Sequence, residues 1–153
     1  MKSIVKFLVV VTAMVSAAAC SKPNDTVSDY LDVTANNIKG VWRMTSYDNG
    51  SQFAEGDYYY ISFNRADRTF VSYDNTGSMG VYKTTGRYDI IVDGAAIIYG
   101  DFDNALGPKA WEHRYYVRNL TDNSMVWVAV DDESIVQTYV RAELPEWISE
   151  DKE

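Results

Sequence analysis

The side chains that most often carry out covalent chemistry are scarce in this sequence. Cys20 and His113 are the only cysteine and the only histidine among 153 residues. A hydrolytic triad needs a base beside a nucleophile; a pairing of His113 with a serine stays open, but no nucleophile motif supports it. Transition-metal sites require several His or Cys ligands. The sequence therefore predicts no catalytic residues, no such metal site and no cofactor, and an enzyme is not expected.

Acidic clusters are the other candidates for chemistry. Asp101, Asp103 and Gly107 are spaced like the start of a calcium loop, but the later oxygen ligands and the closing glutamate are missing. Residues 131–133 (Asp-Asp-Glu) could hold a hard cation loosely. We interpret both as solvated turns. No glycine loop of the phosphate-binding type occurs, and paired carboxylates for glycoside hydrolysis cannot be recognised from sequence.

The first nineteen residues have the composition of an export signal. Lys2 and Lys6 precede an apolar run over residues 7–15, and small residues lead to Cys20. This order is that of a secretory signal peptide. The apolar run is too short to cross a bilayer, which requires about 20 apolar residues. Residues 1–19 are therefore predicted to be removed on export.

Cys20 has two interpretations. Residues 17–20, Ala-Ala-Ala-Cys, resemble the lipobox of bacterial lipoproteins. That resemblance implies that Cys20 is acylated, with palmitate among the acyl groups, and that the protein is anchored in the outer membrane of a bacterial envelope, on its periplasmic or surface face. The alternative is an ordinary cleavage site beside a lone thiol, which would be unusual in an exported chain.

The chain that follows the predicted signal is strongly acidic. Without Lys2 and Lys6, 12 basic residues remain against 22 acidic ones, so the net charge changes from −8 to −10. Nucleic-acid affinity comes from Lys and Arg at phosphates, so nucleic acid is not an expected partner.

The polar residues 20–37 are interpreted as a tether, in which residues 28–36 could form a short helix.

From Gly40 onward, apolar and polar residues alternate as in half-buried strands. We expect strands over residues 40–45, 58–64, 69–73, 79–92, 95–99, 111–120, 125–130 and 135–141, where residues 79–92 form either one long strand or two short ones. Short turns separate them without crossover helices, which favours antiparallel neighbours in a barrel or a sandwich. The barrel is preferred because an open meander leaves two exposed edges. The prediction for residues 38–153 is an all-β, antiparallel up-and-down meander, closed as a small barrel of about eight strands.

Several connections can be predicted in more detail. Gly80 and Gly86 are expected to mark bends or bulges, and Asp93 with Gly94 predicts a tight hairpin. Residues 100–108 are expected to form the longest loop. Residues 142–153 are expected to be an exit segment with a frayed end.

Three short motifs resemble those of the lipocalin and lipocalin-like families. Gly40 and Trp42 resemble the Gly-x-Trp opening, residues 121–123 the late Thr-Asp turn, and Arg141 the terminal arginine. The resemblance, which covers residues 38–141, implies that Arg141 packs across Trp42 and joins the last strand to the first. A cation–π contact of this kind contributes about 0.5–2 kcal/mol. Residues 60–70 resemble the second hairpin of short lipocalin-like lipoproteins, but Arg68 replaces the usual turn glycine, which leaves the turn type open.

The resemblance also implies a calyx that binds a small hydrophobic molecule non-covalently. An eight-stranded barrel is either filled by side chains or holds one small ligand. The expected inward-facing aromatic residues could serve either purpose: Tyr59, Phe63, Phe70, Tyr82, Tyr88, Tyr115, Trp127 and Tyr139.

The alternative is a protein-interaction module with a filled core, such as an inhibitor or a subunit of an envelope complex. Its contacts would come from the loops 49–55 and 100–109 and from exposed aromatic residues, namely Tyr58, Tyr60 and Trp147. Tyrosine and tryptophan are favoured at interfaces.

Overall fold

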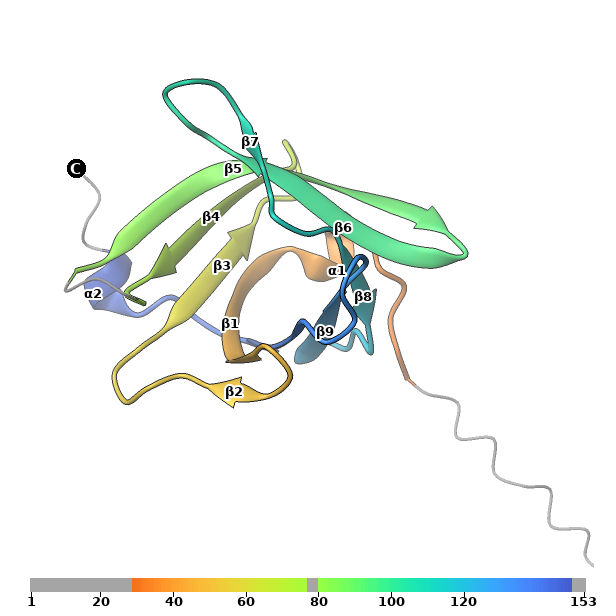
Figure 1. Cartoon of the computed structure of the whole chain (residues 1–153), viewed down its shortest axis with the longest axis horizontal. Coiled ribbons are helices and arrows are strands. Elements are labelled where there is room, and N and C mark those ends of the chain that lie inside the picture. The colour runs from red at the N-terminus through yellow and green to blue at the C-terminus, as the bar shows by residue number, and fades with distance from the viewer. Residues whose placement is uncertain (1–28, 77–79, 150–153) are drawn as a thin grey trace, which may run out of the picture.

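Eight antiparallel strands close into a barrel (Figure 1). The computed structural model describes residues 29–76 and 80–149. The predicted signal peptide, Cys20 and the first part of the tether lie outside these described residues. The barrel strands are β1 (Gly40–Tyr47), β3 (Tyr59–Phe63), β4 (Thr69–Asp74), β5 (Tyr82–Asp93), β6 (Ala95–Phe102), β8 (Tyr115–Arg118), β9 (Ser124–Ala129) and β10 (Val136–Arg141). Two short strands, β2 (Ser51–Gln52) and β7 (Lys109–Ala110), pair with β1 and β6. The predicted all-β barrel is confirmed.

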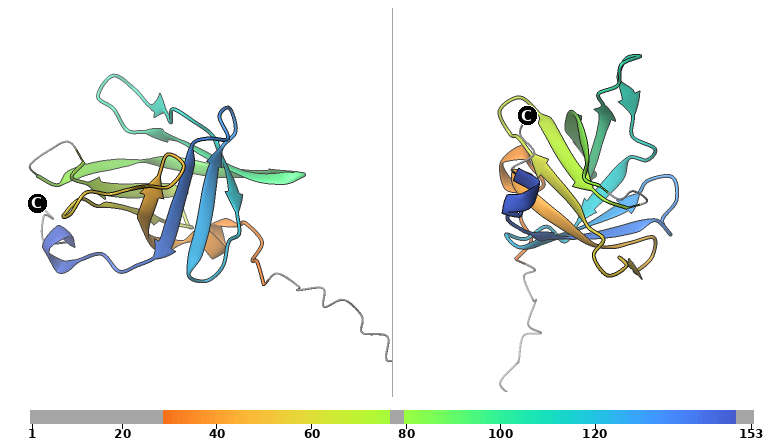
Figure 2. Two further views of the ribbon diagram at one scale, coloured as in Figure 1. Left: turned by 60° about the horizontal axis from the view of Figure 1, so that its bottom comes forward. Right: turned by 90° about the vertical axis from the view of Figure 1, so that its left-hand side faces the viewer.

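The barrel closes where the first strand meets the last. Trp42 lies opposite Arg141, and Met44 lies opposite Tyr139, in the antiparallel ladder between β1 and β10. Figure 2 shows β1, β10 and β9 side by side, as their pairing requires. A register shift follows between Met44 and Ser46, and a bulge of this kind increases local twist. The expected closure is therefore confirmed.

Arg141 and Trp42 form one end of the barrel, which we call the closed end. The Arg141 guanidinium carbon lies 3.7 Å from the centroid of the Trp42 ring. The same guanidinium donates to the carbonyls of Asn37, at 3.0 Å, and Asp122, at 3.1 Å. Gly40 has a φ of +93°, and a Cβ there would lie 3.3 Å from Nη1 of Arg141. Glycine is favoured at this position because it adopts positive φ without steric cost.

Helix α1 (Ala35–Ile38) covers the closed end. Thr34 caps it by accepting a hydrogen bond from the backbone N–H of Asn37, which satisfies one of the free donors of the first turn. The Ile38 side chain is completely buried. The expected helix over residues 28–36 was wrong in its bounds, since residues 29–34 are not helical and the cap at Thr34 sets the start.

The interior near the closed end is filled by side chains. The fully or nearly fully buried members of this cluster include Ile38, Trp42, Phe63, Phe70, Tyr88, Ile98, Leu120 and Met125. Their rings pack edge to face, as between Phe63 and Tyr88, whose centroids are 4.9 Å apart. This half of the barrel is a packed hydrophobic core.

Strands β5 and β6 form a long, regular hairpin. Pairing runs from Gly86 opposite Phe102 to Asp93 opposite Ala95, with the predicted tight turn at Gly94. The bulge expected at Gly86 is absent, since this residue pairs in register with Phe70 on its other side. A Cβ at Gly86 would lie 2.0 Å from the carbonyl oxygen of Asp101 and 2.7 Å from the Phe70 ring. Close packing, and not a bend, therefore explains this glycine.

Some strand ends differ from the prediction. β6 continues to Phe102, into the expected loop 100–108, because β7 folds back and pairs with it. β8 comprises only residues 115–118 of the expected strand 111–120. Trp111 therefore lies on an irregular segment, held by a 2.9 Å hydrogen bond from its backbone N–H to the Gly100 carbonyl.

The hairpin turn between β3 and β4 keeps a left-handed residue although it lacks glycine. Arg68 has a φ of +58°, a conformation that glycine adopts more readily than other residues. Its guanidinium lies 3.5 Å from the Asp89 carboxylate and 5.9 Å from the centroid of the Tyr88 ring. Arg68 therefore combines a strained backbone conformation with side-chain contacts to β5.

The C-terminal segment packs on the outside of the barrel. Helix α2 (Glu146–Ser149) places the buried Ile148 against Tyr58 and Tyr60. These two tyrosines were expected to be exposed, but they are 8% and 9% exposed because α2 covers them. Trp147 is 55% exposed, as expected, and its ring lies 5.0 Å from that of Tyr58.

Candidate ligand-binding site

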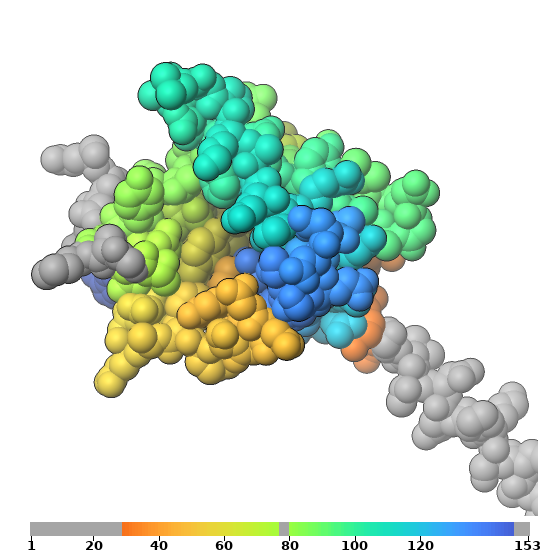
Figure 3. All heavy atoms as spheres, in the orientation of Figure 1, coloured from red at the N-terminus to blue at the C-terminus, as the bar shows by residue number. Residues whose placement is uncertain are grey.

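The end of the barrel opposite α1, which we call the mouth, contains a cavity of about 240 Å³. The cavity lies where β1 and β6 end and where β3, β8 and β10 begin. Figure 3 looks onto this end, where the surface is hollowed inside the ring of strands. The lining side chains are mostly aromatic, and they are Tyr59, Phe102, Trp111, Tyr115, Trp127 and Tyr139, together with Met44, Ile61, Glu112 and Gln137.

Trp127 is the centre of the cavity wall. It points inward from β9, where it lies opposite Gln137 of β10. Its ring centroid is 4.8 Å from that of Tyr139 and 5.3 Å from that of Tyr115. The Trp111 ring stacks over it at 5.8 Å. The wall is therefore a continuous aromatic surface, which suits an apolar ligand.

A chain of polar groups crosses this aromatic wall. The Tyr139 hydroxyl donates to Oε1 of Gln137 at 2.8 Å, and Nε2 of Gln137 donates to the Tyr115 hydroxyl at 3.5 Å. Burial raises the pKa of Tyr115 and of Tyr59 to about 12, and it raises the pKa of Tyr139 well above its usual value. These hydroxyls are therefore uncharged at physiological pH and can orient a polar group of a ligand.

A second cavity of about 290 Å³ adjoins the first. Both are lined by Met44 and Tyr59. The second is walled by the loop around β2, where the rings of Tyr47 and Phe53 meet edge to face at 5.2 Å. Small-molecule sites are typically about 300–1,000 Å³, so the two cavities together offer space of that order.

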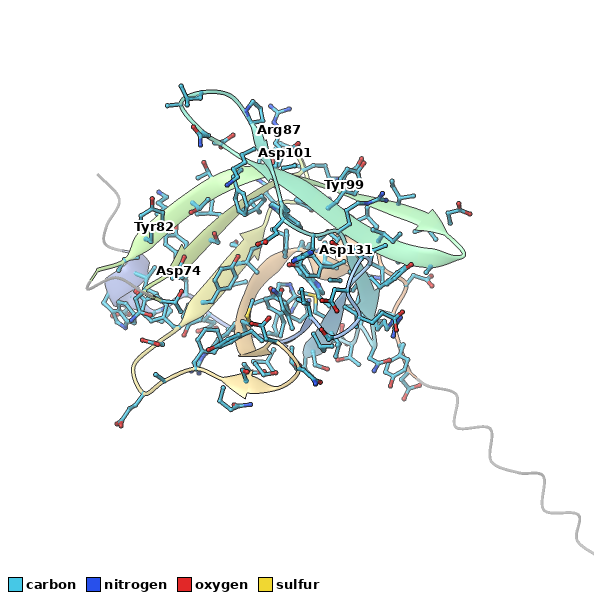
Figure 4. All side chains as sticks on the ribbon, in the orientation of Figure 1. Asp74, Tyr82, Arg87, Tyr99, Asp101 and Asp131 are labelled. Carbon is cyan, nitrogen blue, oxygen red and sulfur yellow. The ribbon has the colours of Figure 1, made fainter. Side chains whose placement is uncertain are left out.

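The predicted ligand-binding residues fall into three groups. Tyr59, Tyr115, Trp127 and Tyr139 line the cavity. Phe63, Phe70 and Tyr88 are at most 3% exposed and belong to the filled core. Tyr82 is 65% exposed at the outer end of β5 (Figure 4), so its placement in the interior was wrong.

The position of Tyr82 has a simple physical reason. It lies opposite Asp74 in the ladder with β4, so it shares the inward parity of the strand. β6, however, pairs with β5 only from Gly86 onward. Tyr82 therefore has a paired neighbouring strand, β4, on one side only, and its ring is left exposed.

Sequence reasoning missed several lining residues. Trp111 and Phe102 belonged to an expected strand start and an expected loop, and only the pairing of β7 with β6 brings them to the mouth. Gln137 carried a usable signal, since it precedes the inward-facing Tyr139 by two residues on the same strand. A polar residue at an inward position would have indicated an open interior.

The polar candidates for chemistry lie near the surface. Asp101 is not in the expected turn, since it is exposed on β6, and Asp103 accepts a hydrogen bond from the Thr85 hydroxyl. Nδ1 of His113 lies 2.9 Å from the Asp131 carboxylate, which lowers the pKa of that carboxyl through their hydrogen bond; Asp131 is labelled in Figure 4. Asp132 accepts from Ser134 within its own turn. Within residues 29–76 and 80–149, no group of three or more acidic, His or Cys side chains could hold a metal ion. In the same residues, no helix has the length and hydrophobicity to span a bilayer.

Comparison with known proteins agrees with this architecture. A family model described as a lipocalin-like domain matches residues 38–127, more than half of the chain. A search of curated proteins and a search of solved structures each found no significant match. The family match begins at Ile38 in the closed end and reaches Trp127 in the cavity wall. The chain therefore belongs to the lipocalin-like domain family.

Proposed function

We propose that this protein binds a small, largely apolar molecule non-covalently inside its barrel. The aromatic cavity at the mouth is the observation that carries the proposal. Burial of ligand surface against these rings would contribute about 25 cal/mol per Å², and the hydroxyls of Tyr115 and Tyr139 would orient the ligand. The proposed activity is binding and not catalysis, in keeping with the family.

Native mass spectrometry of the purified protein tests this proposal. We expect a mass excess that organic extraction removes. Met44 lines both cavities, so Met44→Trp should fill them and abolish the excess. Val92 is 71% exposed on the β5–β6 hairpin, so Val92→Trp is a matched control that should retain it. A folded Met44→Trp variant that keeps the bound mass would contradict binding in the cavity.

We further propose that the protein is a lipoprotein, anchored through acylated Cys20 in the outer membrane. The export signal and the lipobox resemblance support this. The chain enters the barrel at the closed end, where the Leu31 backbone N–H donates to the Leu120 carbonyl at 2.7 Å. A membrane tether would therefore leave the mouth facing away from the lipid surface and open to ligand.

Labelled palmitate and membrane fractionation test the anchor. The wild-type protein should incorporate the label and sediment with membranes, whereas Cys20→Ser should do neither. Ser21→Ala, one residue further on, is the control and should behave as wild type. An unlabelled wild-type protein that fractionates like Cys20→Ser would refute the anchor without affecting the cavity proposal.

A protein-interaction module is the second candidate, favoured by the tip of the β5–β6 hairpin. This tip extends beyond the barrel (Figure 1). Ile91 is 41% exposed there and Val92 is 71% exposed. A stoichiometric partner that survives washing from membranes, and that is lost in Val92→Asp, would support this candidate. Retention of such a partner in Val92→Asp would exclude the tip as its contact.

A further inference from the structure

Two indole N–H groups beside the cavity have no hydrogen-bond partner within residues 29–76 and 80–149. Nε1 of Trp111 and Nε1 of Trp127 are both buried, and neither has an acceptor among the residues that the structure describes. The Trp42 indole, by contrast, donates to the Ile38 carbonyl at 2.7 Å. Buried donors are nearly always paired, because an unpaired one has lost its water without gaining an acceptor.

We propose that the ligand supplies the missing acceptor. On this view the cavity takes an uncharged, flat, apolar molecule with a carbonyl-type oxygen that accepts hydrogen bonds from Trp111 and Trp127. This inference rests on the proposed function and specifies the chemistry of the ligand.

The surroundings of the two indoles show how an acceptor could reach them. Both rings line the cavity and stack with an interplanar angle of 28°. Trp127 is fixed in the β9 ladder and wedged between Tyr115 and Tyr139. Trp111 lies on the irregular segment before β8, with its ring against Gly100. Both N–H groups are enclosed, so the proposal requires the Trp111 ring, which also packs against Phe70 and Phe102, to shift when the acceptor enters.

The charge of the lining indicates a neutral ligand. Among the described residues no Lys, Arg or His lines either cavity, and the carboxylates there are Glu112 in the first and Asp57 in the second. A ligand carboxylate would meet Glu112 without a compensating cation, and a buried charge requires such a partner. The raised pKa values of Tyr59 and Tyr115 have the same cause, since burial disfavours their charged forms.

Three naphthalene probes of similar size separate these features in calorimetric titrations of the full chain. Acetylnaphthalene carries a carbonyl oxygen, isopropenylnaphthalene replaces that oxygen by carbon, and naphthoate carries a negative charge. We expect the ketone to bind about three- to tenfold more tightly than the hydrocarbon for each hydrogen bond formed. Naphthoate should bind most weakly.

Tryptophan variants and nuclear magnetic resonance assign the donors. Trp111→Phe and Trp127→Phe keep an aromatic ring but remove the N–H, so each should reduce the preference for the ketone. Trp147→Phe, outside the barrel, is the matched control and should preserve it. In the wild-type protein the indole N–H resonances of Trp111 and Trp127 should move downfield on adding the ketone, while that of Trp42 should not.

The outcomes distinguish this inference from the proposed function. If ketone and hydrocarbon bind equally and neither indole resonance moves, the acceptor inference is wrong and apolar binding stands. If naphthoate binds more tightly than the ketone, the neutral ligand class is wrong. If no probe binds to the wild-type protein, both proposals fall. Should a phenylalanine variant not fold, the wild-type resonances still decide.

Discussion

At the residue scale, the surroundings of each tryptophan decide what its indole N–H contributes. Trp42 is fully buried, donates to a carbonyl and lies under a guanidinium. Trp127 is 3% exposed and its N–H has no partner among the described residues. Two rings of equal size are therefore buried to a similar extent, one with its polar group satisfied and the other without.

We expect Trp42→Phe to destabilise the protein by at least about 2 kcal/mol more than Trp127→Phe. The first change removes a hydrogen bond of about 0.5–1.5 kcal/mol and weakens the cation–π contact with Arg141, whereas the second removes an unpaired donor whose burial costs about 1–3 kcal/mol. Urea denaturation of the ligand-free variants measures the difference. Equal losses would mean that the Trp127 N–H has an acceptor in solution.

Buried tyrosines should make the fold sensitive to alkaline pH. Burial raises the pKa of Tyr59 and Tyr115 to about 12, whereas an unfolded tyrosine has a pKa of about 10. Between these values the unfolded state binds fewer protons, so stability is fully present below a pH of about 10 and is lost as the pH rises toward 12.

The tyrosine effect can be measured from the pH dependence of urea unfolding. The fall for Tyr115 should reach at most about 3 kcal/mol, since each pKa unit corresponds to about 1.4 kcal/mol. Tyr115→Phe should reduce the slope above a pH of about 10, whereas Tyr30→Phe, at a 53% exposed position, should leave it unchanged. An unchanged slope in Tyr115→Phe would show that its hydroxyl ionises freely in the folded protein.

At the scale of elements, the alternation of apolar and polar residues predicted which face of each strand points inward. It predicted less well where each strand ends. Phe63, Phe70 and Trp127 are buried in the interior as their parity required. Tyr82 has the correct parity but lies where β6 does not reach. Tyr60 has the outward parity and is nevertheless buried, because α2 covers it. Local sequence specifies a face, whereas burial depends on which distant segment lies over that face.

The two glycines near the start of β5 show the same distinction. Both were expected to mark bends, yet a Cβ at Gly86 would meet the Asp101 carbonyl oxygen at 2.0 Å, while a Cβ at Gly80 would meet nothing within 4 Å. Only the pairing of β5 with β4 and β6 creates the close approach at Gly86, so the sequence alone could not separate the two positions.

Gly86→Ala should destabilise the barrel by about 3 kcal/mol or more, because the methyl group would displace backbone and the Phe70 ring. Gly80→Ala should change stability by less than about 1 kcal/mol. Thermal unfolding of the two variants makes the comparison. Similar small effects for both would show that β5 and β6 leave room for a methyl group at Gly86.

At the scale of the whole molecule, the two ends of the barrel have different roles. The closed end contains α1, the Trp42–Arg141 contact and a filled core, whereas the mouth contains the aromatic cavity. The motifs that could be recognised in the sequence lie mostly at the closed end, since closure demands specific residues such as Gly40 and Arg141. The mouth depends on loop geometry, so its ligand-facing residues were predicted only in part.

Arg141 joins the first and last strands of the sheet at the closed end. Its guanidinium donates to the carbonyls of Asn37, Lys39 and Asp122 and covers Trp42. It therefore joins the segment before β1, the turn before β9 and the last strand. Arg141→Ala leaves these carbonyls without their donor and should cost about 2–4 kcal/mol, since hydrogen bonds to charged groups contribute about 1.5–3 kcal/mol.

Hydrogen exchange can locate this loss within the molecule. If Arg141 stabilises the pairing of β1 with β10, Arg141→Ala should accelerate amide exchange along the β1–β10 ladder much more than along the β4–β5 ladder. The reason is that local opening begins where stability is lowest. Arg141→Lys keeps the charge but not the fork of donors, so it should recover only part of the protection. Arg87→Ala, at an exposed position of β5, is the control and should alter neither ladder. Uniform acceleration in Arg141→Ala would show that the residue supports general stability, and that the barrel stays closed through its backbone ladder alone.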